Sequence, residues 1–166
     1  MERDRAQRVI VAVSLDAQRL EVHGDGATLA TFSVSTSKFG PGELRDTFRT
    51  PRGRHVIRAK IGAGQPLGAV FRGRRPTGEI YSPALARAYP NRDWILTRIL
   101  WLSGLEIGKN RLGDVDTMRR YIYIHGTPEA DVLGVPGSIG CIRMSNRDVV
   151  ELFDLVPVGT VVEIGP

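Results

Sequence analysis

The chain has 166 residues, of which 42% are hydrophobic and 25% are charged, and its formal charge is +5 at pH 7. A chain of this length buries roughly 70% of the surface that its unfolded form exposes, so a hydrophobic core can form without disulfides or structural metal ions. No window approaches the roughly 20 consecutive apolar residues of a membrane helix. We therefore expect a single domain over residues 1–166 that is neither disordered nor inserted into a membrane.

The positive charge is carried by arginine, because only three of the 23 basic residues are lysines. Arginine is suited to bidentate binding of carboxylates or phosphates. A basic chain could also bind nucleic acid, but the basic stretches lack interleaved aromatic residues and show no helix-turn-helix or zinc pattern. We predict no nucleic-acid partner, and the oligomeric state stays open.

The N-terminal segment does not have the pattern of an export signal. Residues 1–8 are charged, and the apolar run that follows, residues 9–13, is too short for a signal-peptide core and precedes no small-residue cleavage site. We expect a cytoplasmic location; a periplasmic one would require that a leader segment had been removed.

The first third of the chain predicts antiparallel β-structure. Alternating β-branched and polar residues predict four strands, at residues 9–13, 19–23, 27–35 and 54–61. The turn Gly24-Asp25-Gly26 separates the second strand from the third, and a long loop over residues 36–53 separates the third from the fourth. Residues 62–78 contain five glycines and two prolines, together with Arg72, Arg74 and Arg75. This composition predicts a second long loop with a basic tip.

Short helices and further strands are predicted for the rest of the chain. Ser82-Pro83 predicts the start of a short helix over residues 84–89, and residues 94–102 fit either a buried strand or a buried helix. Residues 121–125 predict a strand with Tyr121, Tyr123 and His125 on one face. Residues 134–140 predict a loop, which is followed by an extended segment at residues 141–144, a capped helix at residues 145–155 and a strand at residues 161–164. The fold class is therefore α+β, predominantly β.

The main candidate for chemistry is the pair formed by His125 and Cys141, the only thiol. A cysteine is an effective nucleophile at neutral pH only if a neighbouring base or positive charge favours the thiolate, and histidine is the usual partner. Gly140 permits close approach of an acyl substrate, and its amide is a candidate donor to a tetrahedral oxyanion. Packing roles for the thiol and the imidazole remain the alternative.

A metal site is not indicated by the remaining histidines. His23 and His55 lie in distant segments and show no HxH or HxxxH spacing. We predict neither a metal nor another cofactor.

Three segments near the C-terminus resemble the signature of the YkuD-type L,D-transpeptidase catalytic domain. They are Tyr123-Ile124-His125-Gly126-Thr127, Gly134-Val135-Pro136, and Ser138-Ile139-Gly140-Cys141-Ile142-Arg143-Met144. Shorter pieces fit the same family, so the resemblance covers essentially the whole chain: Ser35-Thr36-Ser37, Thr50-Pro51-Arg52-Gly53 and residues 159–164.

The resemblance implies a β-sandwich with short peripheral helices and a cysteine enzyme that attacks the L,D bond of a murein tetrapeptide stem, releasing D-alanine. By position in the motif, Cys141 is the nucleophile, His125 its base, and the main-chain carbonyl of Gly126 the group that fixes the imidazole. Substrate binding is assigned to Ser138, Ile139, Tyr123 and Arg143, and Arg143 is equally compatible with a surface role.

Ile139 departs from the family pattern, which usually has Ser-His-Gly-Cys where this chain has Ser138-Ile139-Gly140-Cys141. If His125 is the base, the chemistry survives and the apolar side chain disfavours the thiolate. If the missing histidine matters more, the protein is a catalytically impaired module that binds murein peptides.

Two acyl acceptors are compatible with these residues. Water makes the protein an L,D-carboxypeptidase of peptidoglycan recycling, which the lack of an export signal favours, whereas the amine of a second stem makes it a periplasmic cross-linking transpeptidase. A carboxypeptidase should hold the terminal carboxylate of its substrate, for which the candidates are Arg72, Arg74, Arg75 and Arg98. Of these we assign Arg75 and Arg98 to the substrate site.

Overall fold

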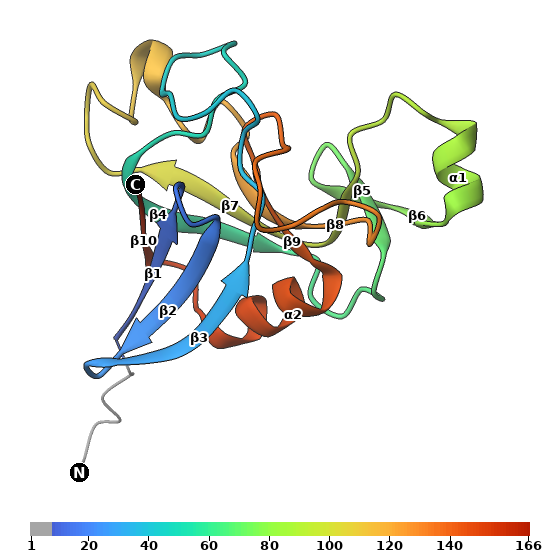
Figure 1. The fold of residues 1–166 in the computed structure, drawn as a ribbon, viewed down its shortest axis with the longest axis horizontal. Coiled ribbons are helices and arrows are strands. Elements are labelled where there is room, and N and C mark those ends of the chain that lie inside the picture. Colours follow the sequence, from blue (N-terminus) through green and yellow to red (C-terminus); the bar gives the residue numbers. More distant parts are fainter. Residues whose placement is uncertain (1–7) are drawn as a thin grey trace.

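The computed structural model describes residues 8–166, and strands dominate it (Figure 1). The strands of this part of the chain are β1 (Val9–Ser14), β2 (Arg19–Gly24), β3 (Ala27–Ser33), β4 (Gly53–Ile61), β5 (Ala69–Arg72), β6 (Arg75–Ile80), β7 (Ile95–Gly104), β8 (Tyr123–Thr127), β9 (Ile142–Ser145) and β10 (Val161–Gly165). The helices are α1 (Pro83–Ala88), α2 (Asn146–Leu155) and the 3-10 turn η1 (Gly113–Val115). The predicted fold class, predominantly β with short peripheral helices, is confirmed.

The strands form one curled sheet whose main path runs β3-β2-β1-β10-β4-β7-β5-β6. β1, β2 and β3 pair antiparallel as predicted, and the C-terminal strand β10 lies parallel to β1. Val11 is paired with Val22 on one side and Val162 on the other, and all three side chains are fully buried. The alternation of apolar residues therefore directs one face of this part of the sheet to the core.

β7 is the branch point of the sheet, because it pairs with β4, β5 and β8. Leu96 is opposite Gly126 and Ile99 is opposite His125, so β7 carries two extra residues, Thr97 and Arg98, relative to β8. Such a bulge bends a strand and increases its twist. β5, β6 and α1 lie on the opposite side of the molecule from β1–β3 (Figure 1).

The main core lies between the sheet and α2, which contacts β7, β8 and β9. Val149, Leu152 and Phe153 of this helix are buried. The helix begins as its sequence predicts, since the Ser145 hydroxyl accepts a hydrogen bond from the Asp148 amide at 3.1 Å. A second, smaller cluster formed by Ala69, Phe71, Ile99 and Tyr123 packs against Cys141. The nucleophile candidate thus lies at the edge of an apolar layer.

Two of the predicted segments require correction. Residues 62–78 are not a loop throughout, because β5 and β6 form a hairpin there. Its first strand is only four residues long and pairs with β7 through two residues, so its glycine-rich and proline-rich flanks dominate the local pattern. The strand predicted over residues 121–125 lies at Tyr123–Thr127, because Tyr121 has a φ of +55° and the strand continues past Gly126. His125 is therefore in the middle of the strand and not at its end. Residues 94–102, for which strand and helix were both open, lie almost entirely in strand β7.

No helix within residues 8–166 has the length and apolar character that crossing a bilayer requires.

Candidate active site

β8 and β9 place the two candidate catalytic residues on neighbouring segments of the sheet. They pair in parallel, with Ile124 beside Ile142 and His125 beside Arg143. Cys141 immediately precedes β9, and the Tyr123 amide lies 3.3 Å from its Sγ. Because side chains alternate between the faces of a strand, Tyr123 and His125 share one face of β8. Cys141 therefore lies beside β8 at Tyr123, two residues before His125 on the same strand.

His125 is fully buried and held in one tautomer. Its Nδ1 lies 2.6 Å from the main-chain oxygen of Gly126, and a carbonyl oxygen can only accept, so Nδ1 carries the proton. Nε2 is buried and has no hydrogen-bond partner among residues 8–166. Burial lowers the pKa of His125, so the imidazole is neutral at pH 7 and Nε2 has a lone pair available for a proton.

The Cys141 thiol is protonated at neutral pH. Cys141 is half-buried, and the loss of water around its sulfur is the main cause that raises its pKa from 9.0 to about 12, against the hydrogen bond from the Tyr123 amide. The Sγ also lies 3.4 Å from the main-chain oxygen of Tyr121, to which the S–H donates. In this conformation Sγ and the His125 imidazole are not hydrogen-bonded to each other. Catalytic hydrogen bonds often form only in the substrate complex.

Cys141 opens into a cavity of about 390 Å³. Its walls are mainly aromatic and aliphatic with three charged side chains, and the lining residues are Phe48, Phe71, Gly73, Arg74, Asp93, Ile95, Ile99, Arg120, Tyr121, Ile122, Tyr123, Ile139 and Cys141. Pockets of this size bind small ligands or the end of a peptide. Ile139 lies in the wall, so the position at which the family usually has histidine faces the cavity with an aliphatic side chain.

Gly126 is required by the close approach of three elements. A Cβ at this position would lie 2.6 Å from the main-chain oxygen of Leu96 in β7, and it would also collide with the Asn146 side chain at the start of α2. Backbone cannot move away from such a contact without displacing a strand. The glycine therefore allows β8 to lie against the β7 bulge with the Gly126 carbonyl directed at His125.

The turn before Cys141 is fixed by hydrogen bonds. The Ser138 hydroxyl donates to the Cys141 carbonyl at 2.6 Å, and the Thr50 hydroxyl donates to the Gly140 carbonyl at 2.9 Å. The Gly140 amide, expected to serve an oxyanion, instead donates to the Ser138 Oγ at 3.2 Å. Ser138 is buried and shapes this turn without lining the cavity. An oxyanion role for the Gly140 amide would require its contact with Ser138 to break.

The arginines assigned to the substrate are distributed differently from the expectation. Arg143 is bound to two carboxylates, that of Asp93 at 3.2 Å and that of Asp131 at 3.5 Å. Arg98 donates to the main-chain oxygens of residues 65 and 97 and lies over the Phe153 ring of α2, away from the cavity lining. Arg75 is exposed in β6 and does not line the cavity either. The structure therefore does not bring Arg75 or Arg98 to Cys141, whereas it does bring Arg74 there.

Two charged residues of the cavity were not anticipated from the sequence. Asp93 lines the cavity and holds Arg143. Its charge adds to the effect of burial in raising the pKa of Cys141, and it partly opposes the effect of burial that lowers the pKa of His125. Arg120 donates to the main-chain oxygens of residues 42, 43 and 49. These three hydrogen bonds attach the loop that contains Phe48 to the cavity wall. Neither residue lies in a recognisable motif, so only the three-dimensional contacts reveal them.

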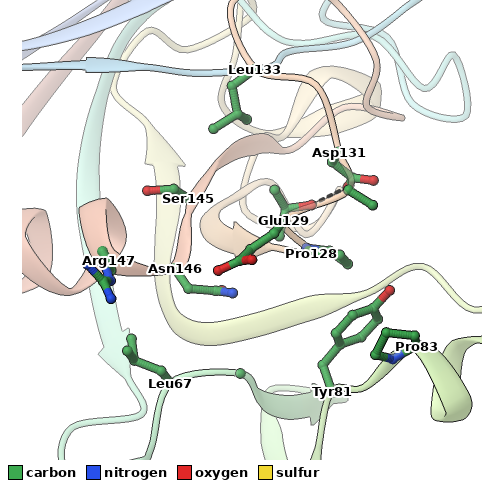
Figure 2. Close-up of a pocket in the computed structure, with 13 residues that line it drawn as sticks. Leu67, Tyr81, Pro83, Pro128, Glu129, Asp131, Leu133, Ser145, Asn146 and Arg147 are labelled. Carbon is green, nitrogen blue, oxygen red and sulfur yellow. Dashed lines mark hydrogen bonds between the residues drawn. The ribbon is translucent and has the colours of Figure 1, made fainter.

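A second cavity of about 580 Å³ lies at the other end of β8 (Figure 2). Leu67, Pro83 and Leu133 supply apolar wall, and Glu129, Asp131 and Arg147 supply charge. The Thr127 hydroxyl donates to the Asp131 carboxylate, drawn as a dashed line in Figure 2. Neither cysteine nor histidine lines this cavity, so the candidate nucleophile Cys141 lies at the other one.

Within the part of the chain that the structure describes, no three His, Cys, Asp or Glu side chains are grouped to hold a metal ion. The cavity lining contains the Cys141 thiol and the Asp93 carboxylate, which is paired with Arg143, while the His125 imidazole is buried outside the lining.

Comparisons with known proteins point in the same direction. The family model described as the YkuD L,D-transpeptidase catalytic domain matches residues 8–164. A protein of Bacillus licheniformis named as the L,D-transpeptidase YkuD is 29% identical over 157 residues, which cover 94% of this chain and 65% of the relative. The chain thus spans slightly less than two thirds of that relative's length.

Solved structures share the fold. An L,D-transpeptidase from Mycobacterium smegmatis superposes with a TM-score of 0.57 at 21% identity, covering 96% of this chain and 59% of the other. L,D-transpeptidase 3 from Mycobacterium tuberculosis, in complex with a faropenem-derived adduct, gives a TM-score of 0.60 at 17% identity, covering 96% and 61%. At these identities the likeness establishes the architecture.

Proposed function

Because the chain belongs to the YkuD family of L,D-transpeptidase catalytic domains, we propose that it attacks the L,D bond of murein tetrapeptide stems through a Cys141 thioester. D-Alanine is the leaving group and water the acyl acceptor, which makes the protein an L,D-carboxypeptidase of peptidoglycan recycling. One observation carries the proposal. Cys141 lines a cavity beside the strand that holds a buried, neutral His125, whose Nδ1 is fixed by the Gly126 carbonyl and whose Nε2 has no described partner.

In the first half of the reaction the thiol and the imidazole act as a neutral pair. As Sγ bonds to the carbonyl carbon, its proton passes to Nε2, because a thiol with a pKa of about 12 does not ionise on its own near pH 7. The C–N bond then breaks, and the imidazolium returns the proton to the departing amine of D-alanine. The product of this half is a thioester on Cys141.

In the second half, water attacks the thioester while Nε2 accepts one of its protons. The C–S bond breaks, the proton passes to sulfur, and the tripeptide leaves with a new carboxylate. Throughout, the Gly126 carbonyl, 2.6 Å from Nδ1, stabilises the charged imidazolium and keeps the ring in its working orientation.

The cavity in Figure 2 favours a second function, transfer of the acyl group to an amine. Glu129 and Asp131 present carboxylates there, and Asp131 contacts Arg143, which in turn contacts Asp93 beside Cys141. Carboxylates attract the ammonium group that an acceptor stem carries. With this acceptor the same thioester yields a cross-linked dimer, the expectation for a periplasmic enzyme.

Mass spectrometry after incubation with a murein tetrapeptide tests the proposal. We expect a loss of one alanine, a transient adduct of the tripeptide acyl group on the protein, and neither of them with the Cys141→Ala variant. An added acceptor stem separates the two functions, because a dimer product supports the amine acceptor. Binding of the tetrapeptide without any alanine release would instead identify an impaired binding module, as Ile139 allows.

A further inference from the structure

We propose that Arg74 binds the C-terminal carboxylate of the stem peptide and so makes the enzyme select substrates that end in a carboxylate. This inference rests on the function proposed above and assigns the substrate-anchoring residue of that site.

Arg74 lies at the turn of the β5–β6 hairpin and lines the cavity together with Gly73 and Cys141. Its φ of +62°, together with +53° at Gly73, is the left-handed pair that a two-residue hairpin turn between paired Arg72 and Arg75 requires. Its neighbours Arg72 and Arg75 are exposed and outside the cavity lining. Among the arginines of the hairpin, the fold directs this one to the thiol.

Two aromatic rings orient the guanidinium. Its central carbon lies 5.0 Å from the ring centroid of Trp101 and 4.8 Å from that of Tyr121. Contact with ring faces occupies the flat side of a guanidinium and leaves the N–H groups along its edge directed outward. The stacking therefore prepares the edge that binds a carboxylate in a bidentate manner.

The hydrogen-bonding capacity of Arg74 is largely unused. It donates to the Tyr123 hydroxyl at 3.1 Å, and no carboxylate within residues 8–166 lies within ion-pair distance of it. By contrast, Arg120 in the same cavity already binds three main-chain oxygens, and Arg143 is held by Asp93 and Asp131. A guanidinium has five N–H donors, so Arg74 can accommodate an incoming carboxylate.

The position of Arg74 relative to the nucleophile fits a terminal residue. Tyr123 bridges the two groups, since its amide lies 3.3 Å from the Cys141 Sγ and its hydroxyl contacts Arg74. The carboxylate of a C-terminal residue lies one residue beyond the attacked carbonyl, roughly 3.5 Å along an extended chain. Adding a hydrogen bond of about 2.9 Å from the carboxylate to a guanidinium gives the distance between the attacked carbonyl and Arg74. This distance is comparable to the length of the Tyr123 side chain, which joins the two groups.

The test compares a murein tetrapeptide with the same peptide carrying a C-terminal carboxamide. We expect the wild-type protein to prefer the acid by roughly 10- to 100-fold in kcat/KM, the range for loss of a charge-assisted hydrogen bond. Arg74→Ala should lose this preference through a higher KM for the acid, with the rate on the amide changing less than about threefold. Arg74→Lys should recover part of the preference. Arg58→Ala is the matched control, because Arg58 stacks on the same Trp101 at 5.9 Å without lining the cavity.

Three results would overturn the inference. Equal rates of the wild-type protein on acid and amide would do so, as would an Arg74→Ala variant that loses the same factor on both substrates, the signature of a merely structural role. If the wild-type protein releases neither alanine from the acid nor alaninamide from the carboxamide peptide, the proposed function fails separately. Calorimetric binding of both peptides to Cys141→Ala then decides the inference, and equal affinity for acid and amide rejects it.

Discussion

The protonation state of Cys141 gives the sharpest prediction from the structure. A thiol with a pKa of about 12 has a thiolate fraction of roughly 10⁻⁵ at pH 7, against roughly 10⁻² for one with the ordinary value of 9.0. Because the thiolate is the nucleophile, alkylation of Cys141 by iodoacetamide should be roughly 1,000-fold slower in the folded protein than in the same protein unfolded in urea. The rate should rise about tenfold per pH unit between pH 6 and pH 9.

The measurement is the pseudo-first-order rate of mass increase, followed by intact-protein mass spectrometry. His125→Ala should alter this rate by less than about threefold, because no hydrogen bond joins Sγ to the imidazole in this conformation. The same variant should lose alanine release, since Nε2 is then missing when the tetrahedral intermediate forms. Cys141→Ser provides the control for modification at other side chains.

A rate plateau between pH 6 and pH 7 would refute this reasoning. It would mean that a thiolate–imidazolium ion pair already exists in the free protein, and that burial is not the dominant influence on the thiol. A large fall in the alkylation rate of the His125→Ala variant would lead to the same conclusion.

Three further substitutions test the framework of the site. Gly126→Ala should lower the free energy of unfolding by about 1–3 kcal/mol in urea titrations, because the new Cβ meets the Leu96 oxygen at 2.6 Å. Gly165→Ala, whose Cβ has open space, should change this free energy little, and equal effects of the two substitutions would exclude the close contact as the cause. Ile139→His should raise the alkylation rate of Cys141 about tenfold at pH 6, where the new imidazole is charged, because a nearby positive charge favours the thiolate. Ile139→Gln should not raise this rate, and an equal gain from glutamine would show that charge is not the cause. Burial lowers the pKa of His55 from 6.5 to about 4, so the unfolded chain binds more protons than the folded one between these pH values. About 3 kcal/mol of stability is therefore lost as the pH falls from 6.5 to 4. His55→Gln should reduce the pH dependence of urea unfolding by that amount, and an unchanged pH dependence would assign it to other groups.

The sequence predicts those parts of the site that depend on local pattern. His125 and Cys141 are recognisable because residue type and spacing carry the chemistry, although His125, predicted at the end of a strand, is the middle residue of β8. The N-cap of α2 and the strands β1–β3 are likewise local, and all of them are found where expected.

The distribution of the arginines could not be predicted in this way. Arg98 follows Thr97 in the β7 bulge, where Thr97 has a φ of +75° and its hydroxyl is bound to Asn146 of α2. Alternation in a regular strand does not reveal where two extra residues are inserted. The contacts of β7 with β8 and α2 determine that Arg98 lies over Phe153 while the hairpin turn brings Arg74 to the cavity.

Part of the cavity wall has backbone conformations that local propensity opposes. Phe48, Arg74 and Tyr121, three of the eight non-glycine residues with positive φ among those described, all line the cavity with Cys141. Each is held by groups remote in sequence or by its own turn. Ser37 binds the Phe48 oxygen, the two-residue turn of the β5–β6 hairpin fixes the Arg74 backbone, and the Tyr121 amide donates to the Met118 oxygen. Such conformations cost of order 1–3 kcal/mol each and persist only where the surrounding structure enforces them. Their concentration beside one thiol indicates that the fold uses part of its stability to shape this cavity, the place where a substrate would be held.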